Sequence, residues 1–106
     1  MITKKRTRKG IPPSNGAVVD WRASLKRRLS RLSAIDGIFV VETQGVIQVY
    51  SVIEELDSRV TDALMKRESL VEKDHPDRVF DFHTRFHQGR PPHRAVPVGA
   101  EPVFVR

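Results

Sequence analysis

The chain has 106 residues, a formal net charge of +6 at pH 7 and no cysteine. This length allows a single domain. The lack of cysteine excludes disulfides, cysteine-ligated zinc and thiol catalysis, and it fits the reducing cytoplasm, which is the expected location. No apolar segment approaches the roughly 20 residues that cross a bilayer. The basic N-terminus also lacks the apolar stretch of a secretory signal, so no membrane partner is expected.

The positive charge is concentrated in the N-terminal third of the chain. Residues 1–34 contain ten Lys or Arg side chains and one acid, Asp20. This asymmetry is typical of proteins that bind nucleic acid or another polyanion. Residues 1–16 are expected to form a disordered basic arm, because Pro12, Pro13 and Gly16 interrupt regular structure. The arm would either bind phosphates without sequence preference or serve as a solubilising tail.

A first helix is predicted from about Trp21 to Ala34, with Asp20 as its cap. Its apolar residues recur at three- and four-residue spacings and so share one face. Arg28 falls within that face, so it must extend to solvent or pair with an acid. The candidate nucleic-acid-binding residues, on this helix and on the arm, are Lys4, Lys5, Arg6, Arg8, Lys9, Arg27 and Arg31.

Residues 38–51 are predicted to form a β-hairpin around the two-residue turn Gln44-Gly45. With this turn, Ile38 and Val40 would lie on one face, and Phe39 and Val41 on the other. Both faces are substantially apolar, whereas a half-exposed hairpin alternates more cleanly. We therefore expect the first helix, the C-terminal tail or another subunit to cover the second face.

A second, long helix is predicted to follow a capping box at Ser51–Glu54 and to run to about Lys73. Arg67 projects from its apolar face. A buried guanidinium needs a carboxylate or water. Glu42 and Asp81 are the candidate partners for a buried ion pair, and extension of Arg67 to the helix edge is the alternative.

A strand is predicted over Arg78–Phe86. Its aromatic residues have one parity, whereas Asp81, His83 and Arg85 have the other, so the two sets face opposite ways. The polar row is either a solvated face or a site in which Asp81 and His83 form an acid–base or metal pair. These two residues are the candidate catalytic groups. The histidine spacing does not indicate a metal site, and no cofactor motif is present.

The C-terminal residues 88–106 contain four prolines and are expected to form a tail outside the core. Within this tail, residues 103–105 could add a short edge strand. We thus predict one α+β domain over residues 17–87, in the order α-β-β-α-β, with two helices on a three-stranded antiparallel sheet. A core of about 70 residues is marginal for a monomer, so either a homodimer or a partner that covers apolar surface is expected.

Two resemblances bear on function. Residues 38–90 resemble small uncharacterised bacterial proteins in which an acidic helix precedes a Phe-Asp-Phe-His strand, here Phe80 to His83, and then Gly89-Arg90. No known activity comes with this resemblance. The order of hairpin, acidic helix and Asp81 strand is also similar to the second half of a minimal nucleotidyltransferase, whose late strand supplies a third metal-binding carboxylate. That family's Gly-Ser-x-Ala-Arg-Gly helix start and paired D-x-D carboxylates are absent, which implies a degenerate, non-catalytic relative.

The sequence favours a small non-enzymatic binding module. Its basic N-terminal third would contact nucleic acid or a nucleoprotein, largely without sequence readout. One alternative is a structural or regulatory homo-oligomer that uses the two-faced hairpin as its interface. The other is a small enzyme that uses the Asp81/His83 face of the late strand. No cofactor and no small-molecule substrate are predicted.

Overall fold

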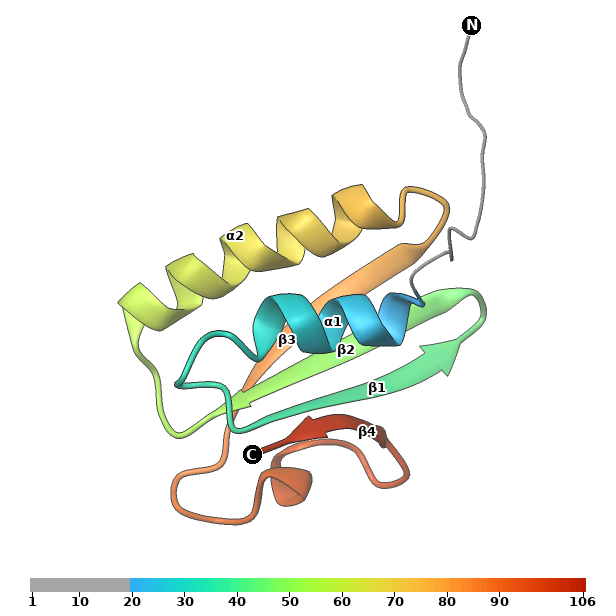
Figure 1. Ribbon diagram of the computed structural model, residues 1–106. Helices are drawn as coiled ribbons and strands as arrows, with labels where there is room; N and C mark the ends of the chain where they lie inside the picture. Colours follow the sequence, from blue (N-terminus) through green and yellow to red (C-terminus); the bar gives the residue numbers. More distant parts are fainter. Residues whose placement is uncertain (1–19) are drawn as a thin grey trace, which may run out of the picture.

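The computed structural model describes residues 20–106 as a helix layer on one face of a β-sheet (Figure 1). The predicted α+β class is therefore confirmed, whereas the proposed arm, residues 1–16, lies outside the described residues. No helix among residues 20–106 is long and apolar enough to cross a membrane. The elements in order are α1 (Trp21–Leu29), β1 (Gly37–Thr43), β2 (Val46–Ile53), α2 (Ser58–Asp74), β3 (Val79–Phe86), the 3-10 turn η2 (Pro92–Ala95) and β4 (Glu101–Val105).

The sheet has four strands in the order β3-β2-β1-β4, and it is mixed. β1 pairs antiparallel with β2 and with β4, whereas β2 pairs parallel with β3. The prediction of three antiparallel strands is wrong in both respects. α2 carries the chain back across one face before β3 begins, which is how parallel neighbours are connected. The fourth strand comes from the C-terminal segment.

The hairpin forms as predicted. Thr43 pairs with Val46, which leaves Gln44 and Gly45 as a two-residue turn. Both turn residues have positive φ, 52° and 82°, as the type I′ turn favoured in hairpins requires.

One bound of each helix differs from the prediction: the start of α2 and the end of α1. Ser51, Val52 and Ile53 are buried residues of β2, so the supposed capping box continues a strand that β-branched residues favour. The true cap of α2 is Asp57, whose carboxylate accepts two backbone N–H groups of the first turn. α1 ends at Leu29, before the predicted Ala34.

The main core lies between the helices and the sheet. Trp21 packs edge-on against Phe80 of β3, with ring centroids 6.5 Å apart. The fully enclosed side chains of this core come from both helices, the two central strands and the segment between α1 and β1; they include Leu25, Leu29, Ile35, Ile38, Ile47, Val49, Ile53, Leu64 and Val71. The apolar stripe predicted for the first helix therefore does face the core.

The second face of the sheet is covered by the C-terminal segment. Phe39, Tyr50 and Val52 form a buried cluster there, and Ala95, Val96 and Ala100 pack against it. Part of the predicted tail thus belongs to the fold, and of the three covers considered for this face the structure shows the tail. Its prolines fit because they stand in turns and on an edge strand, where a missing N–H has little effect.

Candidate nucleic-acid interface

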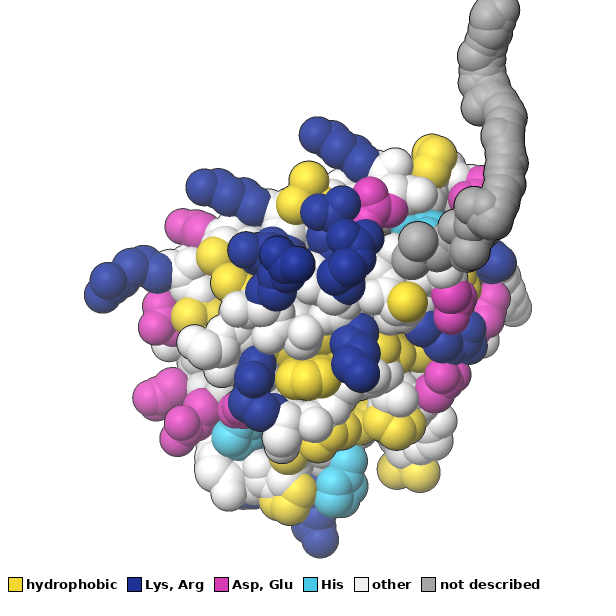
Figure 2. Space-filling view, viewed as in Figure 1, with side chains coloured by type: hydrophobic (Ala, Val, Ile, Leu, Met, Phe, Trp, Pro, Cys, Tyr) yellow, Lys and Arg dark blue, Asp and Glu magenta, His cyan; other side chains and the backbone are white. Residues whose placement is uncertain are grey.

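Four arginines converge on a small hollow in the helix layer, which we call the four-arginine hollow. Arg27 and Arg28 belong to the last turn of α1, Arg31 follows it, and Arg67 comes from α2. These four residues line the hollow, whose volume is about 40 Å³. Lys and Arg side chains gather over this layer in the space-filling view (Figure 2).

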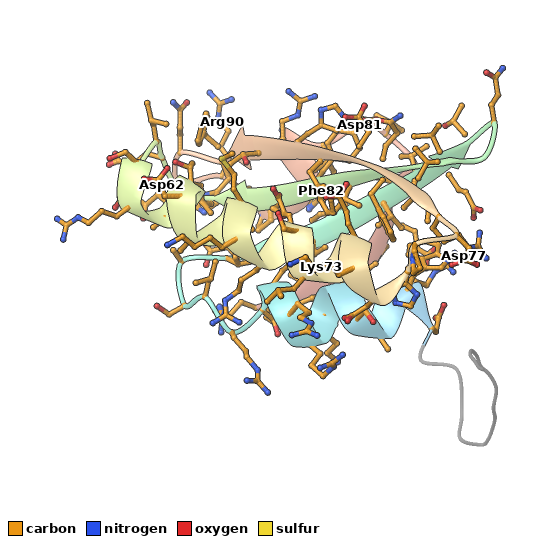
Figure 3. The ribbon with its side chains drawn as sticks, turned by 90° about the horizontal axis from the view of Figure 1, so that it is seen from above. Asp62, Lys73, Asp77, Asp81, Phe82 and Arg90 are labelled. Atoms are coloured by element: carbon orange, nitrogen blue, oxygen red, sulfur yellow. The ribbon has the colours of Figure 1, made fainter. Side chains whose placement is uncertain are left out.

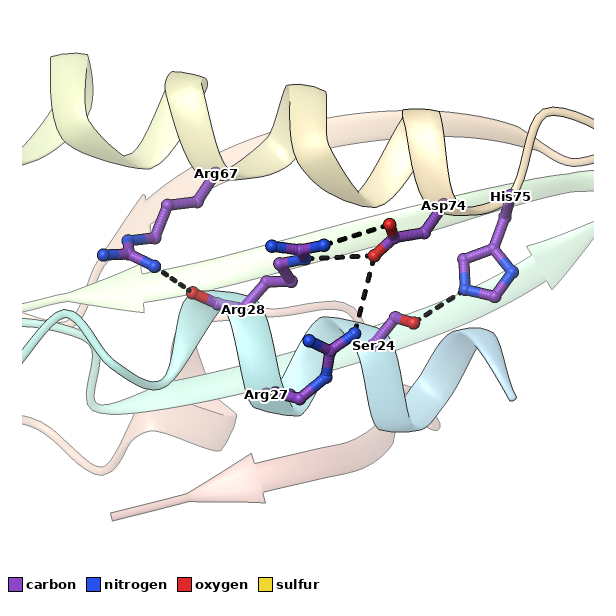
Figure 4. A network of polar contacts seen from close by, with 6 residues as sticks. All are labelled: Ser24, Arg27, Arg28, Arg67, Asp74 and His75. Atoms are coloured by element: carbon purple, nitrogen blue, oxygen red, sulfur yellow. Dashed lines mark hydrogen bonds and ion pairs between the residues drawn. The ribbon is translucent and has the colours of Figure 1, made fainter. Parts of the chain in front are cut away.

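The end of α1 helps to hold these cations together. Backbone carbonyls at a helix C-terminus carry partial negative charge and favour cations nearby. Arg67 uses one of them directly, because its Nη1 donates a hydrogen bond to the Arg28 carbonyl oxygen at 3.4 Å (Figure 4). This contact ties α2 to α1 at the hollow.

Asp74, at the end of α2, anchors two of the four arginines. The Nε and Nη2 atoms of Arg28 donate to the two Asp74 carboxylate oxygens, each at 3.0 Å, and Arg27 Nη2 lies 3.6 Å away (Figure 4). The hydrogen bonds from Arg28 hold the pKa of Asp74 below its ordinary value. The prediction that Arg28 extends to solvent or pairs with an acid is confirmed.

The hollow retains excess positive charge. Among residues 20–106, Asp74 is the only carboxylate in salt-bridge contact with its four arginines. All 13 Asp and Glu residues of the chain lie between Asp20 and Glu101, so residues 1–19 have no acidic side chain to add. Arg31 and Arg67 are thus available to an outside anion.

A larger groove continues this basic surface along α2. It has a volume of about 430 Å³ and shares Arg67 with the hollow. Its remaining lining combines two further cations, one acid and an apolar floor: Arg59, Lys66, Asp62, Leu32, Ala63 and Leu70. An extended polyanion that occupied the hollow would therefore meet more cations beside it.

The candidate partners of Arg67 lie elsewhere. Glu42 is 3.6 Å from Arg78 near the hairpin turn, and Asp81 stands beside His83. Asp81 points away from the helices, whereas Phe82 points towards α2 (Figure 3). Arg67 therefore pairs with neither carboxylate, because it belongs to the helix layer and takes the Arg28 carbonyl instead.

The polar residues Asp81, His83 and Arg85 of β3 do form a row, which lies on the second face of the sheet. His83 Nε2 lies 2.7 Å from Gln48 Oε1 and 3.4 Å from Asp81 Oδ2, and its ring stacks on Tyr50 with centroids 4.8 Å apart. The Arg85 guanidinium lies 5.3 Å from the centre of the same Tyr50 ring. Tyr50 and Gln48 were not singled out in the sequence, because the parallel register that brings them beside His83 was not foreseen.

Two other histidines have structural partners. His75 Nε2 is 2.7 Å from Ser24 Oγ, but Ser24 is completely buried, so this pair links α1 to the end of α2 without access for a substrate (Figure 4). His87 Nε2 lies 2.7 Å from Asp36 Oδ2, and its Nδ1 accepts the Gly89 N–H at 3.1 Å. With both ring nitrogens occupied, His87 anchors the end of β3.

Within residues 20–106 no three His, Asp or Glu side chains gather as metal ligands would. No family model matches the chain, and no curated protein or solved structure matches it either.

Proposed function

We propose that this protein is a small binding module for nucleic-acid phosphates and that the four-arginine hollow makes the central contact. The observation that carries this proposal is the convergence of Arg27, Arg28, Arg31 and Arg67 around one carboxylate, Asp74. Guanidinium groups match phosphate oxygens in charge and in planar geometry. Asp74 orients two of the arginines and leaves the others for the ligand.

The binding would be largely independent of base sequence. Phosphate contacts position a protein on nucleic acid, whereas sequence is read at base edges. The helix layer offers its cations over the hollow and the adjoining groove, with Arg59 and Lys66 extending the basic track. The arm residues Lys4, Lys5, Arg6, Arg8 and Lys9 precede α1 in the chain and would add further phosphate contacts.

The test is the salt dependence of binding to generic duplex DNA and structured RNA. The key variant is Arg31→Gln/Arg67→Gln, which leaves the Arg28–Asp74 pair in place. Loss of two phosphate contacts should weaken binding and make the slope of log K against log salt shallower by about 2. Removal of residues 1–16 should reduce the slope further.

The matched control is Arg90→Gln/Arg94→Gln, which makes the same change of charge on the C-terminal segment. This variant should bind almost as tightly as the unchanged protein, because both side chains are exposed and outside the helix layer. Equal losses in the two double variants would mean that only net charge matters. Binding unchanged by Arg31→Gln/Arg67→Gln and by the truncation would refute the proposal.

A further inference from the structure

The two edges of the sheet differ in how they are protected. β4 has only five residues, contains Pro102, and pairs with β1 through a register irregularity between Ile38 and Phe39. β3 has eight residues and contains neither proline nor lysine. Edge strands expose unpaired N–H and C=O groups, and short length, proline and irregularity are the usual ways to block them. Among the described residues, β3 is therefore the edge left open to another strand.

The direction of the backbone groups on β3 follows from one hydrogen bond. The His87 N–H donates to the Ile53 carbonyl oxygen at 3.0 Å, so the backbone of His87 points towards β2. Backbone groups of successive strand residues point to opposite sides, which aims Asp81, His83 and Arg85 at β2 as well. The outward-pointing backbone groups belong to Phe80, Phe82, Thr84 and Phe86.

We propose that β3 pairs antiparallel with β3 of a second copy of this chain, about a two-fold axis at His83. Phe82 would then lie opposite the partner's Thr84, and Phe80 opposite the partner's Phe86. All these residues have outward-pointing backbone groups, so each pair can exchange both of its N–H to C=O hydrogen bonds. Phe86, which is 39% exposed in the single chain, would be covered.

Charge complementarity selects this register. About the same axis, Asp81 lies opposite the partner's Arg85, and Arg85 opposite the partner's Asp81. These are non-hydrogen-bonded positions, where opposing Cα atoms approach to roughly 4.5 Å and side chains interact most strongly. A shift of the axis by one residue in either direction places Asp81 opposite a histidine. The same shift places Arg85 opposite a residue that is not acidic, so both ion pairs are lost.

The dimer would have a defined face. Residues opposite one another in a sheet share a face, so the helix layers of both copies would lie on the same side. The two four-arginine hollows would then be presented together on that side. The pairing rests on the β3 edge alone and does not depend on what the hollows bind.

The experiment measures the mass of the full chain by light scattering or sedimentation over a range of concentrations. The unchanged protein should form a dimer that dissociates on dilution. Asp81→Arg and Arg85→Asp should each weaken it by about tenfold or more, because two symmetry-related pairs become repulsive. The control Asp77→Arg, an exposed position before β3, should leave the dimer unchanged.

An equimolar mixture of the two single variants provides the sharpest result. One copy would carry arginine at both positions and the other aspartate at both, so the mixture should form a heterodimer although neither variant dimerises well alone. The double variant Asp81→Arg/Arg85→Asp should restore the homodimer. A protein that is monomeric at every concentration, or a dimer that the single variants leave intact, would overturn the proposal.

Hydrogen exchange in the unchanged protein tests the same pairing without a substitution. The amides of Phe82 and Thr84 should become protected as concentration rises, whereas those of Asp81 and His83 should be protected at every concentration by β2. Concentration-independent exchange at Phe82 and Thr84, in a protein that dimerises, would place the interface elsewhere and refute the β3 pairing.

Discussion

Glu68 makes the stability of this fold depend on pH near neutrality. It lies on the core-facing side of α2, between the buried Leu64 and Val71, and the residue is only 9% exposed. Burial, and secondarily the negative charge of Glu72 one turn away, raise the pKa of Glu68 from 4.5 to about 7. The folded protein therefore holds a proton on this carboxyl that the unfolded chain releases.

The sign and the size of the effect follow from this shift. Because the folded pKa is the higher one, the stabilising contribution is complete below pH 4.5 and is lost as pH rises through 7. Each pKa unit corresponds to about 1.4 kcal/mol, which sets a ceiling of about 3 kcal/mol. The carboxyl end is less enclosed than the residue as a whole, and solvent screening reduces the expected loss to about 1–2 kcal/mol.

The substitution that isolates this effect is Glu68→Gln, which keeps the shape and removes the charge. The free energy of unfolding in urea, followed by fluorescence of the single, buried Trp21, should match the unchanged protein near pH 4. At pH 8 the variant should be more stable by about 1–2 kcal/mol. Glu72→Gln, an exposed neighbour, should produce a smaller change, and a difference that does not vary with pH would refute the reasoning.

Three further predictions concern contacts between elements. Gly37→Ala should cost about 1–3 kcal/mol of unfolding free energy in urea, because the new Cβ would come 2.8 Å from a Phe39 ring carbon. An unchanged urea midpoint would show that the Phe39 ring and the C-terminal segment packed on it can shift at little cost. Ser24→Ala should cost about 1–3 kcal/mol by leaving the buried His75 without its partner, and a neutral result would mean that water replaces the hydroxyl. Asp74→Asn should bind nucleic acid more tightly and unfold more easily at pH 7. The stability difference should vanish as pH falls through the lowered pKa of Asp74, and its persistence in acid would exclude the ion pair as the cause.

Local patterns were enough to predict the hairpin and the apolar face of the first helix, whereas Glu68, expected on the acidic outer surface of the second helix, is buried. The Gln44-Gly45 turn and the spacing of Trp21, Leu25 and Leu29 depend on neighbours in sequence, and the structure confirms both. The direction of β3 depends on where α2 returns the chain, and that is a property of the assembled layers. The start of α2 was misplaced because the pattern Ser-x-x-Glu also occurs in a strand that is buried on both sides.

In the candidate interface, too, the residues set by local sequence could be predicted, whereas those brought together by the packing of the helices could not. Arg27 and Arg31 could be named from the basic N-terminal third, although the sequence does not show that their side chains would converge. The sequence marks Arg67 only as a cation on an apolar face, which a carboxylate, water or extension to the helix edge would satisfy. The structure instead places Arg67 at the carbonyl end of α1, 39 residues from Arg28 in sequence. Arg67 thus joins three other positively charged side chains in the four-arginine hollow. Four arginines placed close together repel one another. Asp74 and the backbone carbonyl of α1 offset part of this repulsion, and a bound anion would offset the remainder. That imbalance is the physical reason to look for a phosphate at this surface.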